Sequence, residues 1–237
     1  MFLIVPYFMI KSFLILLSIS ISAFSSQQII LVVSDDINTS HARLQCFEEN
    51  KKVFKNIKVN LGKNGLGWGL GEYNFKHNKN TILKHEGDKK APLGIFKLST
   101  VFGYNAREKL KMPYLFTSKD LICVDDSSSP FYNQIITAHG DEKSFEHMKR
   151  KDFQYKIGVV VAHNTQAKPQ RGSCIFLHVE KFSGAGTAGC TSMPYKELNK
   201  IIHWLDKEKN PLLIQITKSQ KKELMELYPK LQVKGIL

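Results

Sequence analysis

Short runs of β-branched and aromatic residues, separated by polar turns, are the feature of this sequence that most restricts its fold. Such runs predict strands. One stretch has the spacing of an amphipathic helix, with Leu198, Ile201, Ile202 and Leu205 on one face. Many strands and few helices predict a single mainly-β domain over residues 27–217. The predicted strands are residues 29–34, 43–48, 52–60, 95–98, 157–162, 174–179 and 212–216.

Glycine and proline mark the segments between these strands. Four glycines in residues 64–71 predict a loop with unusual backbone dihedrals. Pro92 and Gly94 predict a turn directly before the strand at residues 95–98.

Two further helices and one helix cap are predicted from local patterns. Residues 142–151 are expected to form a short helix. The main helix is expected to begin near Ser192, which would cap it, with Pro194 in the first turn. Residues 218–237 are predicted to be a basic tail, helical and amphipathic, on the surface of the domain.

The amino-terminal residues resemble an export signal. Residues 12–24 form an apolar segment of the length typical of a signal peptide, and Ala23 and Ser25 fit the small positions of a cleavage site. Residues 1–25 are therefore predicted to be a signal peptide, with Met9 as a possible alternative start. The alternative is a retained anchor, which would be the chain's only contact with a membrane. Both place the rest of the chain in the periplasm or cell envelope.

Net charge alone would suggest a nucleic-acid partner. The 237 residues include 34 Lys and Arg against 21 Asp and Glu, a formal net charge of +13. The lysines are spread through most segments instead of alternating with aromatic residues, as a nucleic-acid groove requires. No nucleic-acid partner is predicted, and the oligomeric state is left open.

A cysteine and a histidine carry the chemistry. His178 lies near the end of a predicted strand, and Cys190 follows a glycine-rich loop. A loop of that length can bring the thiol within reach of the imidazole, so that His178 takes the thiol proton. The other ring nitrogen needs an acceptor, for which the carbonyl of Val179 suffices. The alternative is that the pair has no catalytic role, with a buried cysteine and a structural histidine.

Two features are expected to assist such a nucleophile. A helix that begins near Ser192 would favour the thiolate of Cys190 through its dipole. Gly189 allows the backbone to turn its N–H groups towards a carbonyl oxygen, so the amides of Gly189 and Cys190 are the expected oxyanion donors.

These residues also carry a resemblance to a known family. His178 followed by Thr187-Ala188-Gly189-Cys190 resembles the active-site signature of the L,D-transpeptidase (YkuD) catalytic domain of bacterial cell-wall enzymes. The resemblance extends over about residues 29–217. Its other segments are residues 62–69, 86–96, 123–126, 129–133, 172–178 and 204–206.

The resemblance implies a fold, a reaction and a partner. The fold would be a mixed β-sandwich of the YkuD type. Cys190 would attack an L–D peptide bond of a peptidoglycan stem peptide and form a thioester, with His178 as base and then acid. An amine of a second stem would resolve the thioester. No cofactor is implied.

The chain departs from the family pattern at two positions. Many members have Arg two residues after the nucleophile, where this chain has Ser192, and His where it has Ala188. Serine cannot form the bidentate contact that Arg makes with a carboxylate. An L,D-carboxypeptidase or endopeptidase on the same fold, and a non-catalytic wall-binding module, therefore stay open as alternatives.

Four residues are predicted to contact substrate. They are Trp68, Asn164, Thr187 and Ser192. Trp68 could equally pack in the core, and Asn164 could merely end a strand.

The remaining acidic residues and histidines do not form a metal motif. His139, Asp141, His147 and His163 lack the spacing of a zinc site, so no metal is predicted. The pair Asp125 and Asp126 could bind a substrate amine or a metal, but turn formation is favoured.

Three cysteines remain beside Cys190. They are Cys46, Cys123 and Cys174. An oxidising compartment would permit one disulfide and one free thiol. The favoured prediction is that all three pack as thiols in strands.

Overall fold

A computed structural model describes residues 27–73, 75–78 and 80–236. The predicted signal peptide at residues 1–25 lies outside the described residues. Strands dominate the described part of the chain. The strands are β1 Gln28–Ser34, β2 His41–Glu48, β3 Lys51–Lys52, β4 Ile57–Asn60, β5 Leu66–Trp68, β6 Ala91–Gly103, β7 Tyr114–Phe116, β8 Leu121–Val124, β9 Ile135–Thr137, β10 Phe145–His147, β11 Ile157–Val161, β12 Phe176–Val179, β13 Thr191–Met193 and β14 Leu212–Thr217. The α-helices are α1 Tyr195–Trp204 and α2 Lys221–Leu227, with short 3₁₀ turns at Lys207–Lys209 and Lys218–Gln220.

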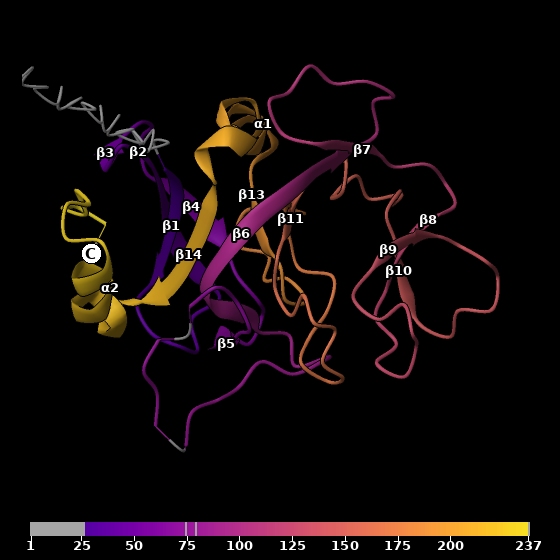
Figure 1. Cartoon of the computed structure of the whole chain (residues 1–237), viewed down its shortest axis with the longest axis horizontal. Coiled ribbons are helices and arrows are strands. Elements are labelled where there is room, and N and C mark those ends of the chain that lie inside the picture. Colours follow the sequence, from indigo (N-terminus) through magenta and orange to yellow (C-terminus); the bar gives the residue numbers. More distant parts are fainter. Residues whose placement is uncertain (1–26, 74, 79, 237) are drawn as a thin grey trace, which may run out of the picture.

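Eight strands close into a barrel (Figure 1). Their hydrogen-bonded order is β1, β14, β6, β11, β12, β13, β4 and β2, and β1 pairs with β2 to complete the ring. The prediction of a mainly-β fold with few helices is confirmed. The expected sandwich differs from this arrangement, because the first and last strands of the ring are hydrogen-bonded to each other.

The most apolar runs of the sequence form the most deeply buried strands of the barrel. Every residue of β1 and of β14 is buried, and the two strands pair in parallel. Parallel strands covered on both faces are continuously hydrophobic. The carboxyl-terminal tail contributes to this core, because Leu224, Leu231 and Val233 are buried in it. The tail is thus less helical than predicted, with α2 limited to Lys221–Leu227, and it is packed as part of the domain.

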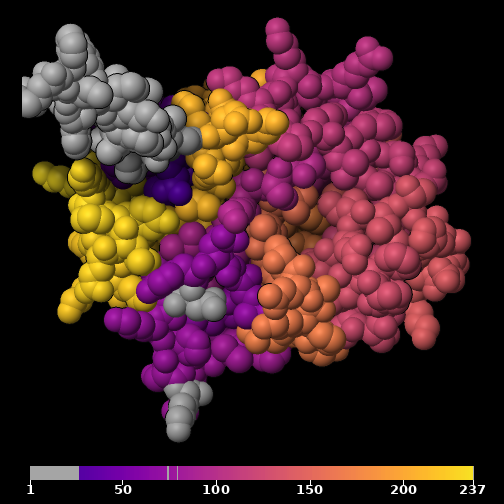
Figure 2. Space-filling model, in the orientation of Figure 1, coloured from indigo at the N-terminus to yellow at the C-terminus, as the bar shows by residue number. Residues whose placement is uncertain are grey.

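A second, three-stranded sheet lies beside the barrel. Its order is β10, β8, β9, and it lies to the right of the barrel in Figure 1. Figure 2 shows residues 105–150 (pink) against the segment that follows β11 (orange). The short helix predicted at residues 142–151 is wrong: β10 occupies this stretch and pairs with β8. Pairing between distant segments overrides local helical preference here.

Strand β6 runs through the predicted turn. Pro92 and Gly94 both lie within its 13 residues, so the turn prediction is wrong. Pro92 is opposite Gly67 of β5, a strand inside the predicted loop at residues 64–71. Gly94 has a φ of 152°, and a Cβ there would lie 2.8 Å from the Phe96 ring. The glycine is needed for close packing along a strand, not for a reversal.

The segment that contains the predicted Cys–His pair crosses from β12 to β13. These two strands pair in parallel, with His178 opposite Ser192. Ser192 therefore belongs to β13 and does not cap a helix, which corrects the prediction. Helix α1 begins at Tyr195 after Pro194, which makes no side-chain cap. The loop between β12 and β13 returns the chain to the start of β12, so that Cys190 lies beside Phe176, two residues before His178.

Candidate active site

One cavity contains both residues of the predicted pair. It has a volume of about 360 Å³ and is lined by His178, Cys190 and the glycine-rich residues 186–189. Cys190 is 6% exposed and His178 is 4% exposed. A cavity of this size falls at the lower end of the range for small-ligand sites.

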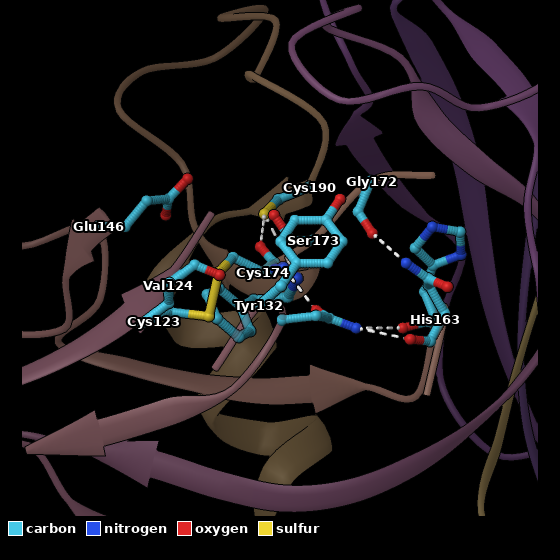
Figure 3. Close-up of a disulfide and its surroundings, with 12 residues drawn as sticks. Cys123, Val124, Tyr132, Glu146, His163, Gly172, Ser173, Cys174 and Cys190 are labelled. Carbon is cyan, nitrogen blue, oxygen red and sulfur yellow. Dashed lines mark hydrogen bonds between the residues drawn. A yellow bond between two sulfur atoms is a disulfide. The ribbon is translucent and has the colours of Figure 1, made fainter. Parts of the chain in front are cut away.

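The Cys190 thiol is held by the backbone that precedes β12. The N–H of Phe176 donates to Sγ over 3.3 Å, and Sγ–H donates to the carbonyl of Cys174 over 3.5 Å. Figure 3 shows this sulfur beside Cys174. Because one segment supplies both the donor and the acceptor, the position of Sγ depends on the path of that segment.

The His178 ring has a defined tautomer. Its Nδ1 lies 2.8 Å from the carbonyl oxygen of Val179, so Nδ1 carries the hydrogen because a carbonyl can only accept. This is the acceptor that the sequence suggested, and the contact is confirmed. In the neutral ring Nε2 is then unprotonated, and within the described residues it has no hydrogen-bond partner. His178 is therefore arranged as a base.

Burial keeps both members of the pair neutral. Burial raises the pKa of the Cys190 thiol to about 12, with a further contribution from the Glu146 carboxylate, against the opposing effect of the Phe176 N–H. Burial lowers the pKa of His178 to about 4, although the hydrogen bond to Val179 opposes this. At neutral pH the pair is a thiol and an uncharged imidazole. A preformed thiolate–imidazolium pair is therefore disfavoured in this cavity.

The predicted effect of the helix dipole is not supported. Helix α1 begins at Tyr195, and the three residues of β13 and Pro194 separate it from Cys190. The field of a helix terminus declines within about one turn. The raised pKa of Cys190 is consistent with this correction.

The glycine-rich loop is fixed by Thr187. Its hydroxyl donates to the carbonyl of Cys190 over 2.6 Å and accepts the N–H of Gly189 over 3.1 Å. Backbone hydrogen bonds from Lys63 to Thr187, and from Thr187 to Leu61, attach the loop to the barrel. The Gly189 N–H is thus already used, which corrects its predicted role. The amide of Cys190 has no partner among the described residues and is the available oxyanion donor.

Gly189 itself is required by the backbone. Its φ is 156°, and a Cβ at this position would lie 3.2 Å from the carbonyl oxygen of Lys90. An L-residue would be strained and crowded here. The glycine therefore shapes the nucleophile's loop without supplying a donor.

Glu146 and Tyr155 are among the cavity residues that sequence reasoning missed. The Tyr155 hydroxyl donates to the carboxylate of Glu146 over 2.5 Å, and the Tyr155 ring meets the His178 ring edge-on at 5.3 Å between centroids. Glu146 comes from β10, where a helix was predicted. Its flanking aromatic residues, Phe145 and His147, were the available sign of a strand. No local signal distinguished Tyr155.

Carboxylates form one part of the cavity wall. Glu86, Asp125 and Glu146 all border the cavity, as do the cationic side chains of Lys84 and Arg150. Burial is the main cause of a raised pKa at Glu146. Lys84 is paired with Asp88 and Arg150 with Asp152. The wall therefore offers carboxylate oxygens to a polar ligand.

The Asp125–Asp126 pair divides between two roles. Asp126 accepts the N–H and the hydroxyl of Ser128, over 2.9 and 2.7 Å, which is turn chemistry as favoured. Asp125 faces the cavity, and its Oδ1 is buried without a hydrogen-bond partner among the described residues. A buried acceptor without a partner is open to a ligand donor.

Three predicted substrate contacts lie away from this cavity. Trp68 packs against the barrel core, and its indole N–H donates to the carbonyl of Phe75. Asn164 is 1% exposed and bonds the backbone of Lys168 and Gly172. Ser192 is 1% exposed in β13. Of the four predicted residues, the cavity brings only Thr187 to the thiol.

One group of metal-ligating types lies elsewhere. Ligand atoms of His139, Asp141 and Glu142 lie within 4.8 Å of one another on the surface. Glu142 already accepts the backbone N–H groups of His139 and Gly140. This is the geometry of a turn closed by its own carboxylate.

The cysteine prediction requires a correction. Cys123 and Cys174 form a disulfide, whereas Cys46 and Cys190 are free and buried. Strand periodicity placed Cys174 in β12, but the strand begins at Phe176, and the preceding turn directs Cys174 towards β8. The contact joins residues 51 positions apart, which local patterns do not report.

The chain was compared with family models, curated proteins and solved structures. No family model, curated protein or solved structure matches this chain. Within the described residues, every helix is too short or too polar to cross a membrane.

Proposed function

We propose that this protein is an exported cysteine acyltransferase, an L,D-transpeptidase that acts on peptidoglycan stem peptides in the cell envelope. The observation that carries the proposal is the shared cavity of Cys190 and His178, in which the imidazole has an unprotonated nitrogen. The sequence resemblance to the YkuD domain supplies the substrate class. The proposal includes the fold, with the closed barrel as this chain's form of the YkuD-type sheet.

The first half of the reaction forms a thioester. The sulfur of Cys190 attacks the carbonyl carbon of an L–D peptide bond while His178 Nε2 takes the thiol proton. The Cys190 N–H stabilises the oxyanion. The carbon–nitrogen bond then breaks, and His178 returns the proton to the departing amine. A neutral pair suits this cycle, because His178 begins and ends it uncharged.

The second half transfers the acyl group. An amine of another stem attacks the thioester and gives its proton to His178, and Cys190 leaves as a thiol. The carboxylates of Glu86, Asp125 and Glu146 are suited to hold an amino group within this cavity. Asp125 is the strongest contributor, because its buried Oδ1 has no partner in the described part of the chain.

Hydrolysis of the same thioester is the second candidate. The cavity volume of about 360 Å³ accommodates one short peptide end. A carboxypeptidase requires no more than this, because water resolves its intermediate. Ser192 in place of the family's Arg also weakens the inference of a transpeptidase acyl donor.

The experiment separates these outcomes. Purified protein is incubated without reductant with a tetrapeptide muropeptide, with and without an acceptor amine. A cross-linked dimer supports the transpeptidase, and tripeptide alone supports the carboxypeptidase. Absence of both products, with the protein folded, would refute the proposal.

A matched pair of variants assigns the nucleophile. Cys190→Ala is expected to abolish turnover and the thioester detected by mass spectrometry. Cys46→Ala replaces the other buried free cysteine, which lies in β2 outside the cavity, and is expected to retain turnover. Equal turnover by both variants would contradict catalysis by Cys190, whereas full cellular function of a Cys190→Ala variant that has lost turnover would favour a non-catalytic wall-binding module.

A further inference from the structure

The disulfide is adjacent to the nucleophile. Cys174, which is bonded to Cys123, is also the residue whose carbonyl accepts the Cys190 thiol over 3.5 Å. Figure 3 shows the disulfide, the Cys174 backbone and the Cys190 sulfur together. All three cysteines belong to one buried cluster that also contains Phe176 and Tyr155.

Cys174 has a backbone conformation that needs restraint. Its φ is 53°, in the left-handed region that residues other than glycine rarely adopt. Two restraints hold it. One is the disulfide to β8, and the other is a hydrogen bond from its N–H to Asn133 Oδ1 over 2.9 Å. Loss of the disulfide would leave this turn to hydrogen bonds, which are those of Cys174 to Asn133, of Gly172 to Asn164 and of Ile175 to Val161.

The same turn sets both contacts of the nucleophile. Cys174 supplies the acceptor and Phe176 the donor for Sγ, and only Ile175 lies between them. If Cys174 relaxed towards a common φ, its carbonyl would rotate away from the thiol. The sulfur would then lose its hydrogen bond to that carbonyl and its alignment with the substrate carbonyl.

The disulfide also joins the two sheets at the cavity. Cys123 lies in β8, and β8 pairs with β10, which carries Glu146 opposite Cys123. The disulfide therefore connects the small sheet that bears Glu146 to the turn that contacts the Cys190 thiol. Both sides of the cavity share this one covalent link.

We propose that the Cys123–Cys174 disulfide is a positioning element for the Cys190 thiol, which completes the site only after the chain meets a thiol oxidant. Two cysteine thiols give two electrons and two protons to a disulfide oxidant R–S–S–R, which leaves as two R–SH. Cys190 takes no part in this exchange and remains a thiol. The kcat measurement rests on the proposed function, whereas the reactivity of Cys190 does not.

The first test uses the full chain and a probe of the thiol. Iodoacetamide alkylation of Cys190 is followed by peptide mass mapping before and after treatment with dithiothreitol. We expect the rate constant at Cys190 to change at least about tenfold on reduction, because alignment and hydrogen bonding of a reacting atom carry effects of this size. Oxidised glutathione should restore the original rate. An unchanged rate with the disulfide fully reduced would overturn the proposal.

The second test separates positioning from stability. The double variant Cys123→Ala, Cys174→Ala should have a kcat at least about tenfold lower with little change in KM, and it should be insensitive to reductant. Both kcat and thermal unfolding are measured, and rates are taken well below the melting temperature. Cys46→Ala is the matched control and should respond to reductant like the native chain. A lower melting temperature with unchanged kcat would assign the bond to stability alone.

The two proposals fail in different ways. If no muropeptide is turned over in either redox state but Cys190 alkylation still depends on the disulfide, the proposed function fails and the positioning role stands. If turnover occurs equally in both states, the positioning role fails and the proposed function stands.

Discussion

Two buried histidines lie near the ends of neighbouring strands, and they differ in the use of their ring nitrogens. His163 follows β11 and is 2% exposed, and His178 lies in β12 and is 4% exposed. His163 uses both nitrogens: Nδ1 accepts the N–H of Leu70 and Nε2 donates to the carbonyl of Arg171. Among the described residues, His178 forms a hydrogen bond through Nδ1 alone.

Their titration does not distinguish them. Burial lowers the pKa of His163 to about 4, and it lowers that of His178 to about 4. The difference therefore lies in hydrogen-bond occupancy and in access to the cavity. A shifted pKa identifies a buried histidine, whereas an unprotonated nitrogen that faces a nucleophile's cavity identifies a base.

Replacement of each histidine gives the largest expected contrast. His178→Gln should lower kcat/KM by about 10³-fold, because the general base is removed. His163→Gln should keep kcat/KM within about threefold but lower the free energy of unfolding by about 1–3 kcal/mol, because buried hydrogen-bonding groups lose their partners. Kinetics and urea unfolding measure both. Comparable rate losses in two folded variants would remove the distinction.

Acid should destabilise the fold through both histidines. Each is neutral in the native state down to about pH 4, whereas in the unfolded chain it binds a proton below about pH 6.5. The unfolded state thus binds more protons, so stability is complete above about pH 6.5 and is lost as pH falls towards about 4. The loss is on the order of 3 kcal/mol for each histidine. Urea unfolding at several pH values should show a smaller loss in His163→Gln, and an equal loss would contradict the assignment.

Activity should persist to a lower pH than it would with a histidine base of ordinary pKa. Because the pKa of His178 is lowered to about 4, the base stays unprotonated in weak acid. The acid limb of kcat/KM should fall near pH 4, and not near 6.5. Native protein and His163→Gln should share this limb. A limb near 6.5 in both would show that His178 is not the titrating base.

Replacement of Thr187 is expected to change kcat by an intermediate amount. Thr187→Val keeps the side-chain shape but removes the bonds to Cys190 O and Gly189 N. We expect kcat to fall about tenfold, because a loop that positions the nucleophile loses two hydrogen bonds. Thr187→Ser keeps the hydroxyl and should stay within about twofold of the native kcat. Equal losses in the two variants would point to packing and not to hydrogen bonding.

The smallest effect is expected at Ser192. Its hydroxyl lies 3.4 Å from Asn60 Nδ2 in a buried part of β13, away from the cavity. Ser192→Ala should therefore leave KM and kcat within about twofold of the native values. A large increase in KM would restore the sequence-based prediction that this residue contacts substrate.

The sequence by itself determined several of the elements and pointed to the Cys190–His178 pair. Periodicity located β1, β11, β14 and α1. The strands are buried and read as apolar runs, and the helix is buried on one face and shows apolar residues at helical spacing. The spacing of His178 and Cys190 around a glycine-rich loop indicated the candidate site. The Val179 carbonyl as partner of His178 was also predictable, since it is the nearest acceptor along the chain.

Only the tertiary structure decided the contacts between distant segments. Barrel closure, the change of residues 142–151 from helix to strand, and the disulfide all depend on pairing across many residues. Glu146 and Tyr155 reach the cavity for the same reason. The neutral state of Cys190 and His178 likewise follows from burial by the folded chain, because desolvation depends on everything packed around a group and not on its sequence neighbours.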